Sequence, residues 1–293
     1  SINNLPFLRH EYLYAWWDSL GGGEWETGEL AIITAERDDE LVGIAPLFLS
    51  TYKNAPTLLF LGSIEISDFL DVIAREEDLP DFIKGLLDFL DSDATPAWDA
   101  LDLQNILNDS PTLNLLREES TARGWDFTQE QLQPSPYVPL PGDFDEYLAG
   151  IDKKQRHEVR RKIRRAEQDQ REVSWYIVDD ESKLDENIEA CCRLMAQHPE
   201  KQEFLTDVMQ SQMKATIHAA FKAGWLQLAF LEVDGEKAAG YLNFDYNNRI
   251  WVYNSGMDLK FRDLSAGWVL LGYLLQWANE HGRDEFDLMR GDE

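Results

Sequence analysis

A short segment late in the chain has residue types suited to binding phosphate. It reads Arg262-Asp-Leu-Ser265-Ala-Gly267, and an apolar-faced helix is predicted from Ser265 to about His281. Small residues let a ligand approach the backbone closely, and unpaired amides at the start of a helix attract anions. We therefore expect Arg262 to supply charge, and the amides of Ser265, Ala266 and Gly267 to supply dipoles, to an anionic ligand.

Predicted strands lead into this segment. The apolar runs 225–233 and 238–246 flank Asp234-Gly235, which predicts a hairpin, and a third run covers 250–256. Two further helices are predicted upstream, over 181–198 and 203–223. The order is thus helices, hairpin, strand, basic loop and helix.

Strand, loop, Arg/Gln-x-x-Gly-x-Gly/Ala and helix form the acyl-coenzyme A signature of GNAT acyltransferases, and the segment 262–267 resembles it with Ser265 in place of the first glycine. The last residues, Phe-Asp-Leu-Met-Arg-Gly-Asp-Glu over 286–293, are similar to the terminal motif of the FemAB-like and CelD (BioF2-like) acetyltransferase branch. Ile66-Ser-Asp68-Phe-Leu-Asp71 also looks like the first half of that branch.

The resemblance implies acetyl-CoA or another acyl-CoA as donor, and no metal. The strand end Asn254, Ser255 and Gly256 would then lie along the pantetheine arm, where a splayed strand offers a backbone amide to the thioester oxygen. Gly256 is equally compatible with a simple turn. Arg290 in the terminal motif could pair with phosphate or with Asp287.

Acylation of an amine requires the acceptor ammonium to lose a proton before it attacks. Asp68 and Asp71 follow a predicted first-half strand and could bind a cationic acceptor or relay its proton. His157 is a second candidate base, because neighbouring cations favour its neutral form. Exposed carboxylates and a surface histidine are the ordinary alternatives, and the sequence does not choose between them.

Basic residues concentrate in one helix. The net charge is −28, yet residues 153–165 hold eight of the 27 Lys and Arg. Arg156, Arg160 and Arg164 share one face of this helix, which resembles the basic helix that opens the second domain of FemAB-like transferases. We expect these arginines to line a phosphate site beside the donor loop. The alternative is a solvated face balanced by acidic neighbours.

The order hairpin, strand, helix, strand occurs twice, with the helix of the first copy predicted over about 79–90, and the proline-rich stretch 133–141 separates the copies. The predicted fold class is therefore α/β (α+β), with two tandem GNAT-like domains that each have a mixed central sheet flanked by helices. Residues 1–134 would form a degenerate domain on the acceptor side, since carboxylates over 74–81 repel a pyrophosphate. Residues 135–293 would hold the acyl donor.

Several other classes of protein lack support in the sequence. No apolar run reaches the roughly 20 residues of a membrane span, and no leader is apparent, so we expect a cytoplasmic protein. Cys191 and Cys192 are adjacent, the five His lack metal-ligand spacing, and hydrolase and zinc motifs are missing. The strong negative charge disfavours nucleic acid and anionic membranes.

The leading hypothesis is an acyl-CoA-dependent N-acyltransferase, an acetyltransferase in the first instance. Its amine acceptor would be a small molecule or a cell-envelope precursor bound in the interdomain cleft. The duplicated architecture and the basic helix favour an alternative, a FemAB-type transferase that uses aminoacyl-tRNA. A third reading is a non-catalytic ligand-binding module in which both halves are degenerate.

Overall fold

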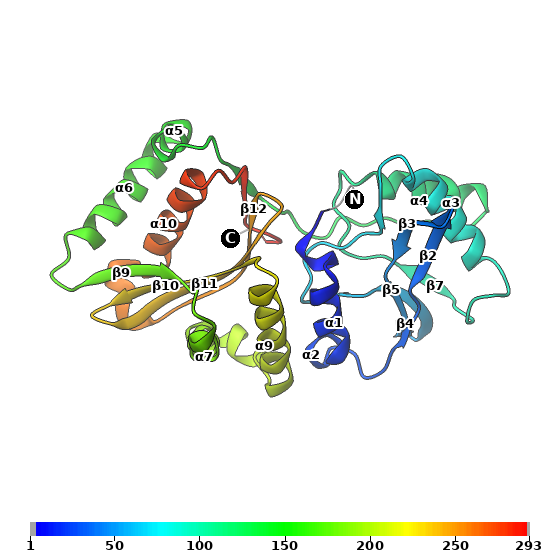
Figure 1. Cartoon of the computed structure of the whole chain (residues 1–293), viewed down its shortest axis with the longest axis horizontal. Coiled ribbons are helices and arrows are strands. Elements are labelled where there is room, and N and C mark those ends of the chain that lie inside the picture. The colour runs from blue at the N-terminus through cyan, green and yellow to red at the C-terminus, as the bar shows by residue number, and fades with distance from the viewer. Residues whose placement is uncertain (1–3, 292–293) are drawn as a thin grey trace. The chain divides into compact units, whose positions relative to one another are not determined.

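The computed structural model describes residues 4–291. The chain divides between Leu132 and Gln133 into two compact units (Figure 1). The predicted domain boundary, between 134 and 135, lies two residues further along the chain. Unit 1 precedes this division and unit 2 follows it. Residues 292 and 293, which end the predicted terminal motif, lie outside the described residues.

Unit 2 is built on a six-stranded sheet with the order β8-β13-β12-β11-β10-β9. Neighbouring strands are antiparallel except β12 and β13, which are parallel. Two-residue turns at Asp234-Gly235 and Asn247-Asn248, all with positive φ, join β10, β11 and β12. The strands are β8 (Tyr137–Pro139), β9 (Val173–Ile177), β10 (Leu226–Val233), β11 (Glu236–Tyr246), β12 (Arg249–Met257) and β13 (Glu285–Asp287).

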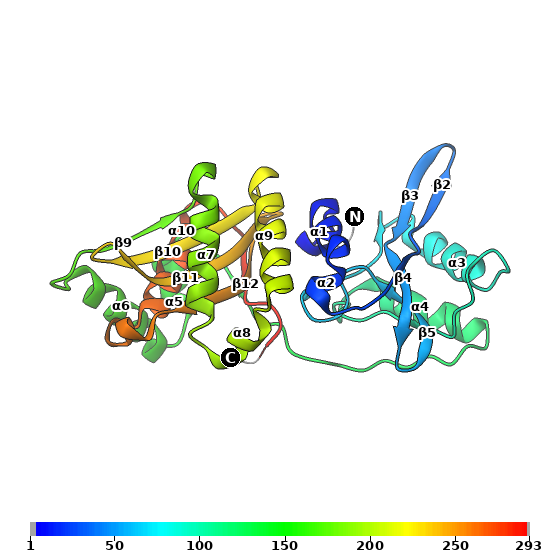
Figure 2. The ribbon, with the colours of Figure 1, turned by 90° about the horizontal axis from the view of Figure 1, so that it is seen from below.

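Helices cover both faces of this sheet (Figure 2). One face carries α5, α6 and α10, and the other carries α7 and α9 (Figures 1 and 2). The predicted helix over 203–223 is interrupted, because α8 ends before α9 starts. The bounds are α5 (Phe144–Gly150), α6 (Lys153–Glu167), α7 (Leu184–Met195), α8 (Pro199–Phe204), α9 (Asp207–Lys222) and α10 (Ala266–Glu280), with 3-10 turns at η2 (Glu181–Lys183) and η3 (Leu259–Leu264).

The core of unit 2 lies between α10 and the sheet. Leu270 and Leu274 of α10 pack with Ile250 and Phe286 of the parallel strands, and all four are fully buried. Burial of each such side chain stabilises the fold by about 1.5–3 kcal/mol. On its other side α10 packs closely on α6, because a Cβ at Gly272 would lie only 3.0 Å from Ile163 Cδ1.

Unit 1 contains two sheets, with the orders β1-β4-β5-β7 and β2-β3-β6. The helix predicted over 79–90 is observed as α3 with those bounds. The elements are η1 (Pro6–Leu8), α1 (His10–Asp18), α2 (Leu20–Gly23), β1 (Glu29–Leu30), β2 (Ile33–Arg37), β3 (Glu40–Ala45), β4 (Leu47–Tyr52), β5 (Ala55–Phe60), β6 (Ile73–Ala74), α3 (Leu79–Leu90), β7 (Ala100–Asp102) and α4 (Pro111–Ala122).

The two units repeat one arrangement. In unit 1, β5 and β7 are parallel and α3 connects them, as α10 connects β12 and β13 in unit 2. However, the single central sheet predicted for the first domain is divided in two. Pro46 separates β3 from β4 at the place where unit 2 has the unbroken β11, and a proline cannot donate a ladder hydrogen bond.

The start of α3 is not available to an anion. Asp78 lies at its N-cap position, and its buried carboxylate pairs with Arg37 Nη1 at 2.6 Å and with Arg75 Nε at 2.9 Å. A protein carboxylate thus already occupies the favourable end of the helix dipole. That the carboxylates over 74–81 repel a pyrophosphate stays a prediction.

Gly256 is required by packing between α7 and β12. A Cβ at this position would lie 2.4 Å from the carbonyl carbon of Leu194 and from the backbone nitrogen of Met195. Both of those atoms belong to the backbone and cannot turn aside. The contact accounts for glycine here without any ligand, whereas a Cβ at Gly267 would make only an ordinary 3.7 Å contact with Met257 Sδ.

We predict that Gly256→Ala lowers the free energy of unfolding by about 1–3 kcal/mol, because the added methyl group overpacks the contact between α7 and β12. Gly267→Ala is the matched control, and it should leave stability unchanged or raise it by up to about 1 kcal/mol, since alanine favours helix. Urea unfolding of both variants measures the difference. Equal stabilities of the two would contradict the packing assignment.

Candidate active site

The loop between β12 and α10 has the geometry of an anion site. Ser265 precedes α10 with φ 56° and ψ 46°, the left-handed conformation, and its side chain makes no cap hydrogen bond. The first turn of α10 contains no acidic residue. The amides of Ala266, Gly267 and Trp268 therefore lie at an uncapped helix start, where the dipole favours negative charge.

The left-handed backbone explains the family pattern at this position. Glycine adopts positive φ without cost, whereas an L-residue there costs roughly 1–2 kcal/mol. Ser265 occupies the place of the first glycine in the resemblance and retains the glycine-type conformation. The substitution therefore changes the side chain while preserving the path of the loop.

Cations surround this loop in a chain that is otherwise acidic. Arg262 is exposed, and its guanidinium makes no hydrogen bond or ion pair within residues 4–291. Arg171 pairs with Asp263 at 2.8 Å, and the hydrogen bond from Arg171, helped by its positive charge, lowers the pKa of that carboxyl. Lys162 of α6 lies 4.8 Å from the ring centre of Trp268, a side chain that is 61% exposed. Sequence reasoning missed Lys162, Arg171 and Trp268.

β12 and β13 part immediately beside the loop. Their parallel pairing covers only Arg249 to Trp251, opposite Glu285 to Asp287, while β12 continues to Met257. β12 also carries a bulge, because Val252 and Asn254 pair with adjacent residues of β11 and leave Tyr253 as the extra residue. The strand end named in the sequence analysis therefore has one edge that β13 does not cover.

The predicted donor residues Asn254 and Ser255 lie on this edge and are bonded to a side chain from α8. Lys201 Nζ donates to Asn254 Oδ1 at 2.9 Å and to the Ser255 carbonyl at 2.7 Å. The Ser255 amide donates to Asn254 Oδ1 at 2.9 Å. No sequence signal identified Lys201, since it lies more than 50 residues before its partners.

The three predicted phosphate-binding arginines of α6 differ in their partners. Arg156 donates to the carbonyls of Leu148 and Ala149 at the end of α5. Arg160 pairs with Asp145 at 2.9 Å. The guanidinium of Arg164 has no such partner in the described part of the chain. Arg156 thus caps a neighbouring helix, whereas Arg160 and Arg164 line a common groove. That the three bind phosphate together stays a prediction.

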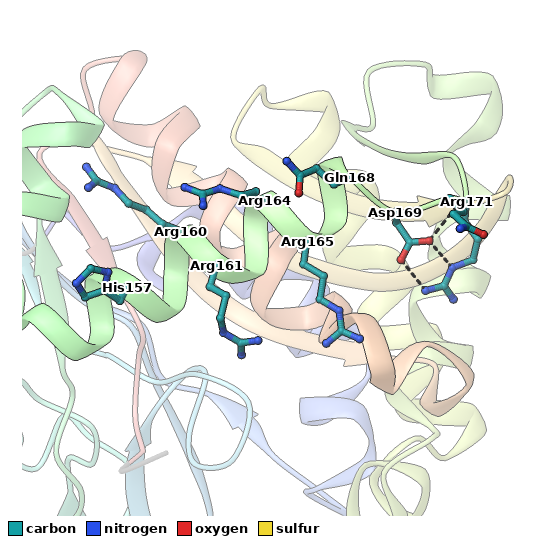
Figure 3. A pocket seen from close by; sticks show the side chains of 9 residues that line it. His157, Arg160, Arg161, Arg164, Arg165, Gln168, Asp169 and Arg171 are labelled. Atoms are coloured by element: carbon teal, nitrogen blue, oxygen red, sulfur yellow. Dashed lines mark hydrogen bonds and ion pairs between the residues drawn. The ribbon is translucent and has the colours of Figure 1, made fainter.

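A shallow groove of about 1180 Å³ runs along the outward face of α6 and into the following loop (Figure 3). Val159 and Ile163 face α10. His157 lies two positions before Val159, and Arg161 lies two positions from both, so these two residues lie on the opposite side of the helix. The groove is lined by His157, Arg160, Arg161, Arg164, Arg165, Gln168, Asp169, Gln170 and Arg171. His157 therefore belongs to an arginine-rich surface.

The two candidate carboxylates of unit 1 have different environments. Asp71 is 1% exposed and accepts hydrogen bonds from Ser110 Oγ at 2.6 Å and from the Val72 amide at 2.7 Å. Burial raises its pKa, against the effect of these hydrogen bonds. Asp68 is partly exposed and has an interacting partner. Asp71 is thus held by hydrogen bonds in the interior, and its exposure makes Asp68 the better candidate for contact with an acceptor.

The terminal motif is held by the linker. Leu288 donates its amide to the Pro136 carbonyl, and Gly291 donates to the Pro134 carbonyl. The buried Asp287 accepts the amide of Met289 at 2.7 Å. Arg290 is partly exposed and also has an interacting partner.

Two absences hold for residues 4–291. No cluster of three or more His, Cys, Asp or Glu side chains has the geometry of a metal site. Nor does any helix in this range combine the length and the apolar character needed to cross a membrane.

Comparison with known proteins agrees with this geometry. Residues 153–293 match the family model of the GNAT acetyltransferase domain. The crystal structure of FemX superposes with a TM-score of 0.67 at 13% identity, covering 99% of this chain and 85% of FemX. The chain has a GNAT-superfamily, FemAB-like fold. Its GNAT unit includes α6, the β12–α10 junction and the uncovered edge of β12.

Other solved structures share the fold at low identity. The C-terminal domain of a candidate lysylphosphatidylglycerol synthetase from Agrobacterium fabrum has a TM-score of 0.55 at 12% identity, covering 96% of this chain and 78% of that one. The structure of L-PGS from Bacillus licheniformis has a TM-score of 0.54 at 16% identity, covering 96% of this chain and 75% of that one. No curated protein matches the chain significantly in sequence.

We predict that Ser265→Gly raises the free energy of unfolding by about 1 kcal/mol, because it removes the left-handed strain of an L-residue. Ser265→Ala is the control. It keeps the strain and removes a hydroxyl that makes no cap bond, so stability should change little. Thermal unfolding measures both variants, and a destabilised glycine variant would show that the serine side chain supports the loop.

Proposed function

We propose that this protein is an acyl-CoA-dependent N-acyltransferase, with acetyl-CoA as the first donor to test. The pyrophosphate would bind at the start of α10, and the acyl-pantetheine arm would lie along the edge of β12. The observation that carries the proposal is the uncapped start of α10 behind Ser265, next to Arg262, whose guanidinium has no partner among residues 4–291. A phosphate there would gain helix-dipole stabilisation and a charge-assisted hydrogen bond.

The acyl transfer itself needs an amine and a way to polarise the thioester. The acceptor ammonium first loses a proton, and the neutral amine then attacks the thioester carbonyl. The C–N bond forms as the C–S bond breaks, the nitrogen gives up a second proton, and coenzyme A leaves as the thiol after its sulfur takes up a proton. The bulge at Tyr253 interrupts the ladder with β11, and a backbone amide of the strand end that follows it is the proposed donor to the thioester oxygen. Asp68 of unit 1 is the proposed contact for the cationic acceptor.

A FemAB-type reaction with aminoacyl-tRNA is the second candidate. The arginine-rich groove of α6 favours it, since guanidinium groups bind phosphodiesters, and Arg164, which lines the groove, makes no hydrogen bond or ion pair within residues 4–291. Fold likeness to FemX extends over nearly the whole chain. The acceptor would then belong to the cell envelope. The net charge of −28 opposes binding of a long polyanion.

Calorimetric titration with acetyl-CoA tests the leading proposal. No heat of binding at millimolar donor would refute it. A gel shift with aminoacylated tRNA at low and moderate salt tests the second candidate, because phosphate contacts weaken steeply with salt. Binding of tRNA without binding of acetyl-CoA would exchange the order of the two candidates.

We predict that Arg262→Glu weakens acetyl-CoA binding by at least about tenfold, which corresponds to the roughly 1.5–3 kcal/mol of a charge-assisted hydrogen bond. Arg160→Glu is the matched charge reversal. Arg160 already pairs with Asp145. The affinity of this variant for the donor should therefore stay within about twofold of that of the wild type, and its melting temperature should be slightly lower. A larger effect at Arg160 than at Arg262 would move the phosphate site to the α6 face.

We predict that Asp68→Asn lowers the rate of thiol release from acetyl-CoA, measured with a panel of amines, by at least about tenfold. Donor affinity should not change. Asp71→Ala should instead cost about 1–3 kcal/mol of unfolding free energy, because it removes the carboxylate that accepts the hydrogen bond of the buried Ser110 hydroxyl. Unchanged turnover in Asp68→Asn would remove Asp68 from the reaction.

A further inference from the structure

The backbone groups of Ser255 point away from β11. The Asp258 amide donates to the Ala238 carbonyl at 2.9 Å, and Ser255 lies opposite Tyr241 in the antiparallel ladder. Successive residues of a strand turn their N–H and C=O to alternate edges. The backbone N–H of Asp258 points toward β11. Ser255 lies three residues earlier, so its backbone N–H and C=O point to the opposite edge of β12, which β13 does not cover.

Side chains of this same unit occupy both of these groups. The N–H of Ser255 is bonded to Asn254 Oδ1, and its carbonyl accepts from Lys201 Nζ. Lys201 also donates to that same Asn254 oxygen. The three bonds form a closed ring, so the edge of β12 carries an internal substitute for a neighbouring strand or ligand.

The element that supplies Lys201 is small. α8 spans six residues and contains no buried residue. Elements with few buried contacts open at low free energy, whereas β12 itself is fixed by its ladder with β11. Lys201 can therefore leave the edge without unfolding the sheet.

We propose that Lys201 and Asn254 form a latch on the donor edge of β12, which an incoming arm with amide groups must displace. The inference rests on the proposed function, because the pantetheine arm of acyl-CoA carries two amides. A backbone N–H donates one good hydrogen bond, so Asn254 Oδ1 and a carbonyl of the ligand compete for the N–H of Ser255. Lys201 and Asn254 thereby select among ligands. A ligand with a pantetheine arm must open the latch, whereas a ligand that reaches only the phosphate site binds without opening it.

Calorimetry on the full chain tests the latch with two probes, coenzyme A and adenosine 3′,5′-bisphosphate, which carries phosphates but no pantetheine arm. Lys201→Met should tighten coenzyme A binding by about tenfold and leave the affinity for the bisphosphate within about twofold. Asn254→Ala should act in the same direction. The double variant should gain less than the sum of the two, since both changes open one latch.

Lys222→Met, an exposed lysine on α9, is the control and should change neither affinity. Should Asn254→Ala fail to fold, Lys201→Met decides alone. The latch is overturned if the wild type binds coenzyme A and Lys201→Met binds it equally or more weakly. If neither the wild type nor the variants bind coenzyme A, the proposed function and the latch both fail. Binding by the variants alone supports both.

Discussion

The parallel pairing of β12 with β13 is the constraint on which the candidate site depends. Parallel neighbours need a crossover, and here η3 and α10 provide it. The crossover helix must begin near the carboxyl end of β12, so its unpaired amides come to lie where the two strands part. The anion site and the uncovered strand edge are thus two consequences of one connection.

The packing around this connection leaves little freedom. Gly256 allows the end of α7 to contact the backbone of β12, and Gly272 allows α6 to approach α10. The second contact brings Lys162 of α6 against Trp268 in the first turn of α10. A strongly acidic chain thus places a lysine beside a helix start whose dipole favours an anion.

Unit 1 has the same crossover but a different chemistry. Pro46 divides its sheet, and Asp78 with two arginines occupies the start of α3. A protein carboxylate there satisfies the helix dipole internally, so no ligand charge is required. The same fold can thus carry a donor site in one copy and a different role in the other, because the decisive groups lie in one loop.

The sequence by itself determined the repeated order of elements, the α3 helix and the Arg262-to-Gly267 junction, because periodicity and turn residues act over short distances. It also predicted a basic helix, but not that Arg156 caps α5 or that Arg160 pairs with Asp145. Nor could it separate the buried Asp71 from Asp68. Burial, and contacts such as that of Lys201 with Ser255, join residues far apart in the chain, and only the tertiary structure decides which of them meet.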